Sequence, residues 1–307
     1  ARARHPRPAF AGAAGVSEIT QPGIYSVPAT VYHGDPAPEP SISASLIRML
    51  LEASPLHAWR AHPRLGNCGE DRKTAESDCG TAAHAMLLEG RDIIDVVDAP
   101  DWRTKAAKDA RDASRAAGRV PLLADDADDV CAMVGAARAQ LTDHEACDTF
   151  RHGKAEQTVL WREGDVWCRA LVDWLPDSPR WPLQDYKTTG MSANPDAWSR
   201  RLVDDYDIQA AWYLRGVAAV RGVRPHGFRF VVQETAPPYL LSVLEPGPDV
   251  LALADRKIER ALTIWRECRR TGKWPGYPTR VATVTLPGWA EARWLEREYR
   301  EEVENAA

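Results

Sequence analysis

The sequence predicts one α/β domain with a helical elaboration near its N-terminal end. Three observations support this. Two apolar stretches near the middle of the chain have the composition of β-strands, amphipathic helical patterns precede them, and long helices with two further strands follow. A chain of 307 residues can bury a large core. We expect a flexible basic tail over residues 1–22 and the single domain over residues 23–307.

The first organised stretch is expected at residues 23–35, which alternate like a β-hairpin or a pair of short strands. A helical stretch follows over residues 40–63, with Ser41 or Ser43 as its N-cap. The helix expected over residues 78–90 ends at Gly90, since glycine is the common residue just past a helix C-terminus.

The remaining elements are predicted from hydrophobic period and from turn residues. In order they are a short apolar run at 93–97, a charged helix at 102–119, an amphipathic helix at 127–141, the two central strands, a long helix at 198–220, strands at 228–234 and 239–245, and a final long helix at 248–270.

Charge and cysteine content exclude several classes of protein. The net charge of -5 means that a nucleic acid would need a local basic channel, since the chain as a whole repels it. The six cysteines form no C-x-x-C pair, which excludes zinc-ribbon and iron–sulfur spacing and favours a reducing cytoplasm. No apolar run approaches the roughly 20 residues of a membrane span. The N-terminal tail could also be a transit peptide.

The two central strands each end in a carboxylate, Asp173 and Asp185, and Lys187 follows the second. Because side chains alternate along a strand, Asp185 and Lys187 point to one face, and a neighbouring strand can bring Asp173 close to them. Hard oxygen ligands beside an ammonium group suit a Mg²⁺ site that hydrolyses phosphodiesters. The alternative is that the charges face water, but apolar neighbours such as Val172 and Leu183 indicate buried strands.

Three other side chains are unremarkable when taken alone. His84 lies among alanines in a helix, and Gln209 and Tyr213 lie four residues apart on one helical face. Each of these residues is equally typical of an amphipathic helix that only packs against the sheet.

The order of these residues resembles the RecB-like branch of the PD-(D/E)xK nuclease superfamily. The pattern is G-x-x-x-H, an aspartate ending one strand, D-x-K on the next, and Q-x-x-x-Y on the following helix. From about Ile24 to Trp289 the chain is similar to the RecE (exonuclease VIII) type exonuclease domain of phages and bacteria. The matching blocks, in chain order, are SISASLIRMLLEASPLHAW, GTAAHAMLLEG, DWRTKAAKDARDASRAAGRVPLL, GKAEQTVLW, CRALVDWLPD, LQDYKTT, DIQAAWYLRGV, GKWPGYP and LPGWA.

This resemblance implies a restriction-endonuclease-like fold with a central mixed β-sheet flanked by helices. It also implies a site for Mg²⁺ or Mn²⁺. The implied ligands of this ion are Asp173, Asp185 and the backbone carbonyl of Tyr186, and His84 would coordinate a second or peripheral metal site. Lys187 would position the attacking water and stabilise the transition state, and Gln209 and Tyr213 would orient the substrate strand or the lysine. Glu156 is either a supporting acid or a structural one.

The activity implied is metal-dependent exodeoxyribonuclease activity on one strand of duplex DNA, 5′→3′, leaving 3′ single-stranded overhangs for homologous recombination. The implied partners are double-stranded DNA ends, further copies in a ring, and a single-strand annealing protein. Arg103, Lys105 and Lys108 either line the DNA channel or form a solvent-facing stripe. Many relatives have arginine where this chain has Leu171, and Arg169 is the candidate substitute.

Two alternatives remain open at this point. One is a non-catalytic DNA-binding recombination protein on a degenerate nuclease fold, against which the intact set of His84, Asp173, Asp185 and Lys187 argues. The other is a RecB-like nuclease that acts on another end, another strand or RNA.

Overall fold

The computed structural model describes residues 19–66 and 75–306, and it divides into two compact units, one ending at Pro275 and one beginning at Gly276. Residues 1–18 of the expected tail, and Cys68, lie outside the described residues. Ile19 is already buried against Trp167, and it is four residues before the expected start of the domain. That residues 276–307 belong to the same domain as the rest stays a prediction.

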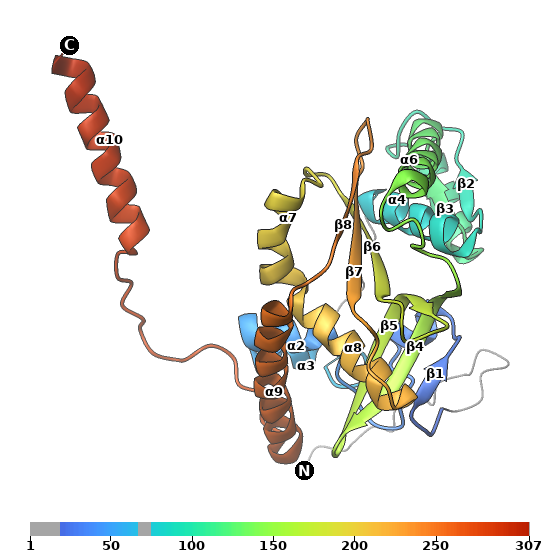
Figure 1. The fold of residues 1–307 in the computed structure, drawn as a ribbon, viewed down its shortest axis with the longest axis horizontal. Helices are drawn as coiled ribbons and strands as arrows, with labels where there is room; N and C mark the ends of the chain where they lie inside the picture. Colours follow the sequence, from blue (N-terminus) through green and yellow to red (C-terminus); the bar gives the residue numbers. More distant parts are fainter. Residues whose placement is uncertain (1–18, 67–74, 307) are drawn as a thin grey trace. The chain divides into compact units, whose positions relative to one another are not determined.

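A six-stranded mixed sheet forms the centre of the first unit, in the order β1-β4-β5-β6-β7-β8 (Figure 1). Only β6 and β7 run parallel within it, and the other neighbours are antiparallel. The strands are β1 (Gly23–Tyr25), β4 (Gly153–Glu163), β5 (Val166–Pro176), β6 (Leu183–Thr189), β7 (Phe228–Glu234) and β8 (Leu241–Leu244). The expected mixed central sheet flanked by helices is confirmed.

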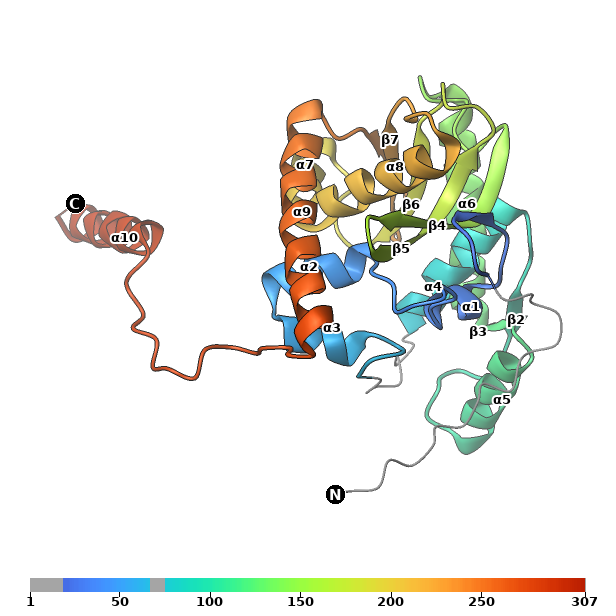
Figure 2. The ribbon, with the colours of Figure 1, turned by 90° about the horizontal axis from the view of Figure 1, so that it is seen from below.

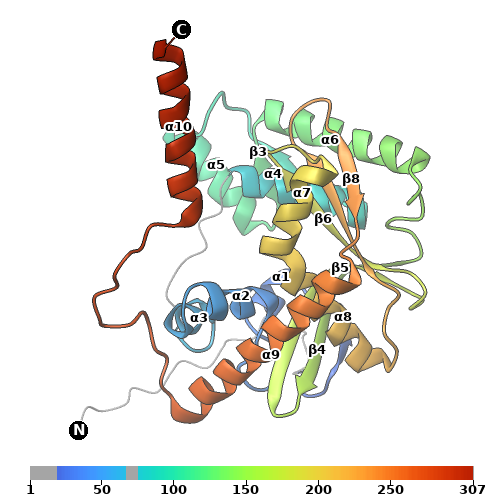
Figure 3. The ribbon, with the colours of Figure 1, turned by 60° about the vertical axis from the view of Figure 1, so that its left-hand side comes forward.

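One face of the sheet is covered by helices that come from both ends of the unit (Figure 3). These are α2 (Ala44–Glu52), α3 (Pro55–Ala61), α7 (Pro195–Arg201), α8 (Asp207–Arg221) and α9 (Pro248–Thr271). A π-helical turn, η2 (Leu202–Tyr206), joins α7 to α8. Helix α8 approaches β4 closely at Gly216, which lies against the ring of the buried Trp161. This face therefore holds the larger core, and α8 is fixed at a short distance from the sheet.

The opposite face carries α4 (Ala75–His84), α6 (Ala124–Asp143) and a small parallel sheet of β2 (Ile94–Val96) and β3 (Val120–Leu122) (Figures 1 and 2). A π-helical turn, η1 (Ala85–Glu89), continues α4 and ends at Gly90, whose φ is 64°. This confirms the expected glycine C-cap, because a left-handed residue ends a helix most easily without a Cβ. Helix α5 (Lys105–Ala116) lies next to β3.

One expectation near the N-terminus is wrong. Residues 29–33 form a short helix, α1 (Ala29–His33), where the alternating pattern predicted a strand. Pro28 suits the position before a first turn, and Gly34 donates to the carbonyl of Thr30 to close it. The helix buries Tyr32, whose ring lies 5.8 Å from the guanidinium of Arg169. Tertiary packing therefore overrides the local pattern.

The second unit contains a helix that the sequence analysis missed, α10 (Gly288–Ala306). Leu295, Tyr299 and Val303 recur at four-residue spacing and lie exposed on it. This spacing is typical of a helix, but acidic and basic residues occupy most of the positions between these three. Among the helices of the described residues, none is long and apolar enough to cross a membrane.

Gly216 supports a test of how α8 is placed. A Cβ at this position would lie 2.6 Å from the Trp161 ring, so Gly216→Ala should lower stability by about 1–3 kcal/mol through overpacking. Gly135 in α6 has open space around its added Cβ, so Gly135→Ala should be neutral or should stabilise by up to about 1 kcal/mol. Thermal melts followed by circular dichroism compare the two variants. Equal melting temperatures would contradict the close contact.

Candidate active site

Strands β5 and β6 are joined in register at Trp174 and Gln184 and then separate. Asp173 lies at this fork. Its Oδ2 accepts a hydrogen bond of 3.0 Å from the backbone N–H of Tyr186, a donor that has lost its place in the strand ladder. The carboxylate is therefore fixed between the two strands. It lies close to Asp185 and Lys187, which precede and follow Tyr186 in β6 and point to the opposite face of that strand.

Asp185 and Lys187 lie on the same face of β6, as strand alternation predicts. The Lys187 ammonium forms a close ion pair with Oδ2 of the fully buried Asp185. Gln209 on α8 donates from Nε2 to the other oxygen, Oδ1, at 2.5 Å. The Lys187 nitrogen also lies 5.5 Å from the centre of the Tyr206 ring, within range of a cation–π interaction. Asp185 and Lys187 are thus held from the side of η2 and α8.

On the other side of Asp173, a histidine and a second acid complete a cluster. His84 Nε2 lies 2.9 Å from Asp173 Oδ2, and His84 Nδ1 lies 3.2 Å from Glu156 Oε1. Glu156 is in β4, opposite Asp173 between two paired positions of the β4–β5 register. Its φ of 51° is unusual for a non-glycine residue in a strand. Strained backbone of this kind is found more often at functional sites than elsewhere.

Burial and charge shift the proton affinities of this cluster in opposite directions. Burial disfavours a charged His84, but the Asp173 and Glu156 carboxylates outweigh it and raise the pKa of His84 to about 9. Burial, with Asp173 nearby, raises the pKa of Asp185 to about 7. Burial likewise raises the pKa of Glu156 to about 7, against the opposing effect of His84. When no cation is bound, protons on His84, Glu156 and Asp185 therefore offset part of the negative charge of the carboxylates.

Asp173 and Lys187 stay charged in this setting. Burial alone would raise the pKa of Asp173, but His84 and Lys187 outweigh it and lower that pKa. Burial alone would lower the pKa of Lys187, but Asp185 and Asp173 outweigh it and raise that pKa. A protonated Lys187 is a hydrogen-bond donor and a positive charge, so it can stabilise charge on phosphate oxygens and orient water.

The donor set fits a divalent cation. Ligand atoms of His84, Glu156 and Asp173 all lie within 4.8 Å of one another, close enough to surround one ion. Two carboxylates suit both Mg²⁺ and Mn²⁺. Of these two ions, the imidazole ligand favours Mn²⁺, because Mn²⁺ is a transition metal. Asp185 is not part of this triad, and it contacts Lys187 and Gln209 instead. Asp173 therefore lies between the triad and the Asp185–Lys187 pair.

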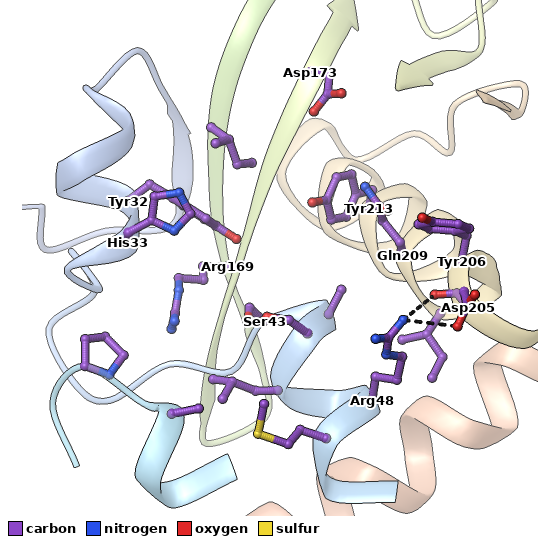
Figure 4. A pocket seen from close by; sticks show the side chains of 18 of the residues that line it. Tyr32, His33, Ser43, Arg48, Arg169, Asp173, Asp205, Tyr206, Gln209 and Tyr213 are labelled. Carbon is purple, nitrogen blue, oxygen red and sulfur yellow. Dashed lines mark hydrogen bonds and ion pairs between the residues drawn. The ribbon is translucent and has the colours of Figure 1, made fainter. Parts of the chain in front are cut away.

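Two pockets flank the cluster and both reach Lys187. The larger, about 770 Å³, lies on the α2 and α8 side and includes Asp173, and Figure 4 shows Tyr206, Gln209 and Tyr213 along one wall. The smaller, about 430 Å³, lies on the α4 side and includes His84 and Glu156. A molecule in either pocket can therefore reach the reactive side chains.

The structure brings His84, Asp173, Asp185 and Lys187 together, as the sequence pattern suggested. Gln209 contacts Asp185, and Tyr213 lies one helical turn after Gln209 and lines the same pocket. The ring of Tyr186 lies 6.2 Å from the ring of His84, and its hydroxyl donates to Gln233 at 2.6 Å. A ligand role for the Tyr186 carbonyl stays a prediction.

The basic residues Arg103, Lys105 and Lys108 are exposed at the start of α5, and they line neither of the two pockets described above. Their role in DNA binding stays a prediction.

Sequence reasoning undervalued Glu156 and missed Tyr206. Nothing in the sequence distinguishes Glu156 from other acids of a strand, because its position depends on a local backbone conformation. Tyr206 precedes Gln209 by three residues, the spacing of one helical face, and this is the one signal that could have suggested it.

Comparisons with known proteins agree with this fold. No curated protein matches the chain. Among solved structures, a crystal structure of a candidate exonuclease from Eubacterium rectale is similar, with a TM-score of 0.58 and 12% sequence identity. The similarity covers 86% of this chain and 97% of that chain, and at this identity it supports the fold alone. Residues 43–286 match a family described as a PDDEXK-like domain of unknown function (DUF3799). The chain therefore belongs to this PDDEXK-like family.

Proposed function

We propose that the protein is a metal-dependent nuclease that hydrolyses phosphodiester bonds of DNA. The observation that carries this proposal is the fork between β5 and β6, where Asp173, Asp185 and Lys187 meet beside His84 and Glu156. Carboxylates with a neighbouring imidazole would hold a divalent cation, and an adjacent ammonium group would face the phosphate. Membership of a PDDEXK-like family supports the same chemistry.

Each side chain has a distinct role in this proposal. His84, Glu156, Asp173 and Asp185 would hold the cation, which when bound supplies Lewis-acid activation of water and phosphate. Lys187, protonated and held by Asp185 and Tyr206, would orient the attacking water and stabilise negative charge on the phosphate oxygens. Gln209 would keep Asp185 in position, and Tyr213 would support Gln209 from the next turn of α8.

The finer activity is also a proposal. We infer exonuclease action on one strand of duplex DNA, 5′→3′, giving 3′ overhangs for recombination. The resemblance of the sequence blocks to RecE-type exonucleases supports it. Rings of several copies and a single-strand annealing partner belong to the same inference, because an acidic chain needs an enclosed basic path to retain DNA. The described cysteines carry free thiols, which agrees with a cytoplasmic location.

Replacing the ammonium group tests the mechanism. Lys187→Ala should lower the cleavage rate of linear duplex DNA in Mg²⁺ by at least about a hundredfold, because preorganised charge at the phosphate is lost. DNA binding should change little. Lys154→Ala removes an exposed lysine of β4 and is the matched control. Duplexes labelled at either the 5′ or the 3′ end, with Mg²⁺ or EDTA, also report the polarity. Cleavage by Lys187→Ala at the wild-type rate, or cleavage that persists in EDTA, would exclude the proposed mechanism.

Cation binding should depend on pH. His84 must lose its proton to act as a ligand, and its pKa is about 9 in the metal-free protein. Mn²⁺ affinity should therefore rise about tenfold per pH unit between pH 7 and 9. It should fall more steeply below pH 7, where Glu156 and Asp185 take up protons. Isothermal titration calorimetry in two buffers of different ionisation enthalpy measures both affinity and proton release. Affinity that is independent of pH would remove His84 from the ligand set.

Tyr206 should act through its ring. Tyr206→Phe keeps an aromatic face beside the Lys187 ammonium and should keep cleavage within about threefold, since a cation–π interaction of roughly 0.5–2 kcal/mol needs no hydroxyl. Tyr206→Leu removes that face and should lower kcat about tenfold with a smaller change in KM. Steady-state kinetics on duplex DNA compare the two variants. If both lose the same activity, the hydroxyl rather than the ring is what matters.

A further inference from the structure

Gln233 is a fully buried polar side chain that the proposed chemistry does not use. It is 0% exposed in β7, where the other buried residues are apolar, namely Phe228, Phe230, Val231 and Val232. Burying an amide in such a strand is unfavourable unless its polar atoms are paired, and an apolar side chain of similar size would avoid that requirement. Core stability alone therefore does not explain a glutamine at this position.

The amide of Gln233 is held in one orientation. Its Nε2 donates to the carbonyl of Met133 at 2.8 Å and to the carbonyl of Tyr239 at 3.2 Å, which leaves Oε1 as the acceptor. That oxygen accepts from the Tyr186 hydroxyl at 2.6 Å, and all three contacts are buried. Met133 lies in α6 and Tyr239 in the turn between β7 and β8. Two elements outside the site therefore fix the amide, and the amide fixes the hydroxyl of Tyr186.

The ring of Tyr186 packs against the imidazole of the candidate active site. Its centre lies 6.2 Å from the centre of the His84 ring, and it lies 6.4 Å from that of Phe150 in an edge-to-face arrangement. Both separations are within the range of aromatic pairs. Tyr186 is only 4% exposed, so its ring has little room to turn. The hydroxyl contact and Phe150 therefore determine where the aromatic surface beside His84 lies.

A close approach of α4 to β6 brings His84 to this ring. A Cβ at Gly80 would lie only 3.2 Å from Oγ1 of Thr188, and His84 follows Gly80 by one helical turn on the same face of α4. Four residues of helix span roughly 6 Å and two residues of strand roughly 6.6 Å. The contact of Gly80 with Thr188 and the contact of His84 with Tyr186 are therefore in register along the two elements.

Tyr186 also holds the carboxylate next to this imidazole. Its backbone N–H donates to Asp173 Oδ2 at 3.0 Å, and the same oxygen lies 2.9 Å from His84 Nε2. One residue thus contacts Asp173 through its backbone and His84 through its ring. Fixing that ring at Gln233 therefore fixes the distance between the two contacts.

We propose that Tyr186 and Gln233 are positioning residues that set the separation of His84 and Asp173 for a divalent cation. The inference rests on the proposed function, because it takes these two side chains as ligands of that cation. Neither positioning side chain would touch the cation, and both would act through the ligands. Removing side chains that orient metal ligands typically weakens metal binding by roughly 10–100-fold.

The test removes one or both partners of the hydrogen bond. Tyr186→Phe keeps the backbone and the ring but removes the hydroxyl, Gln233→Met replaces the amide by an apolar side chain, and a double variant combines the two. Tyr239→Phe is the control, because it removes another hydroxyl of the same network, which donates to Asp129 at 2.9 Å, and keeps the Tyr239 carbonyl. Isothermal titration calorimetry without DNA measures Mn²⁺ affinity, and circular dichroism in EDTA measures the melting temperature.

Each single variant should bind Mn²⁺ about tenfold more weakly and should melt at a lower temperature, since each leaves a buried polar group unpaired. The double variant should recover much of the melting temperature, because the carbonyl of Tyr239 still accepts from Gln140 at 2.9 Å and the unpaired groups are gone. Its Mn²⁺ affinity should stay about tenfold weaker than that of the wild type. Tyr239→Phe should bind Mn²⁺ as the wild type does.

A purely structural role would give other results. Wild-type affinity in either single variant, affinity that recovers with the melting temperature in the double variant, or equal weakening in Tyr239→Phe would overturn the positioning role. The proposed function fails separately, because a wild type that binds Mn²⁺ but cleaves no DNA would exclude the nuclease and leave the positioning role in place. A wild type that binds no Mn²⁺ would overturn both.

Discussion

The hydrogen bond from the Tyr186 backbone to Asp173 is the contact on which the site depends. It lies where β5 and β6 stop pairing, and it replaces a ladder bond with a side chain. In a conventional ladder the Tyr186 N–H would donate to a backbone carbonyl of β5 and would not be available to a side chain. The fork therefore frees a backbone donor, and that donor fixes the acid beside the pocket.

The charges around this contact depend on one another. Asp173 lies between the imidazole of His84 and the ammonium of Lys187. Burial, together with the negative charge of Asp173, raises the pKa of Asp185 and the pKa of Glu156. Such groups titrate together, so protonation of one group changes the pKa of the others. Gln209 and Tyr206 contribute by position, because each contacts one member of the Asp185–Lys187 pair from the side of α8.

Sequence reasoning succeeded where strand and helix periods determine position. Asp185 and Lys187 share a face because strands alternate, and Gly90 ends a helix because it tolerates a left-handed backbone. It failed where long-range packing decides, as in α1, which forms because Tyr32 packs under Arg169.

Glu156 shows the same limit within the site. Its place opposite Asp173 depends on the β4–β5 register and on a positive φ, neither of which a residue pattern encodes. The network of Asp35, Ser41 and Arg169 joins segments more than a hundred residues apart, so sequence spacing gives no sign of it. By contrast, α10 has an ordinary helical pattern and was missed because its charged residues obscure a narrow apolar stripe.

The two pockets on either side of Lys187 differ in charge. The larger one contains three arginines, whereas the smaller one combines Glu89 and Glu156 with His84. Hydrolysis of a phosphodiester leaves a fragment with one more negative charge than it had as part of the chain. If the enzyme acts as proposed, that fragment is attracted more strongly to the side with the arginines. The built-in polarity of the cleft would then bias which fragment leaves first.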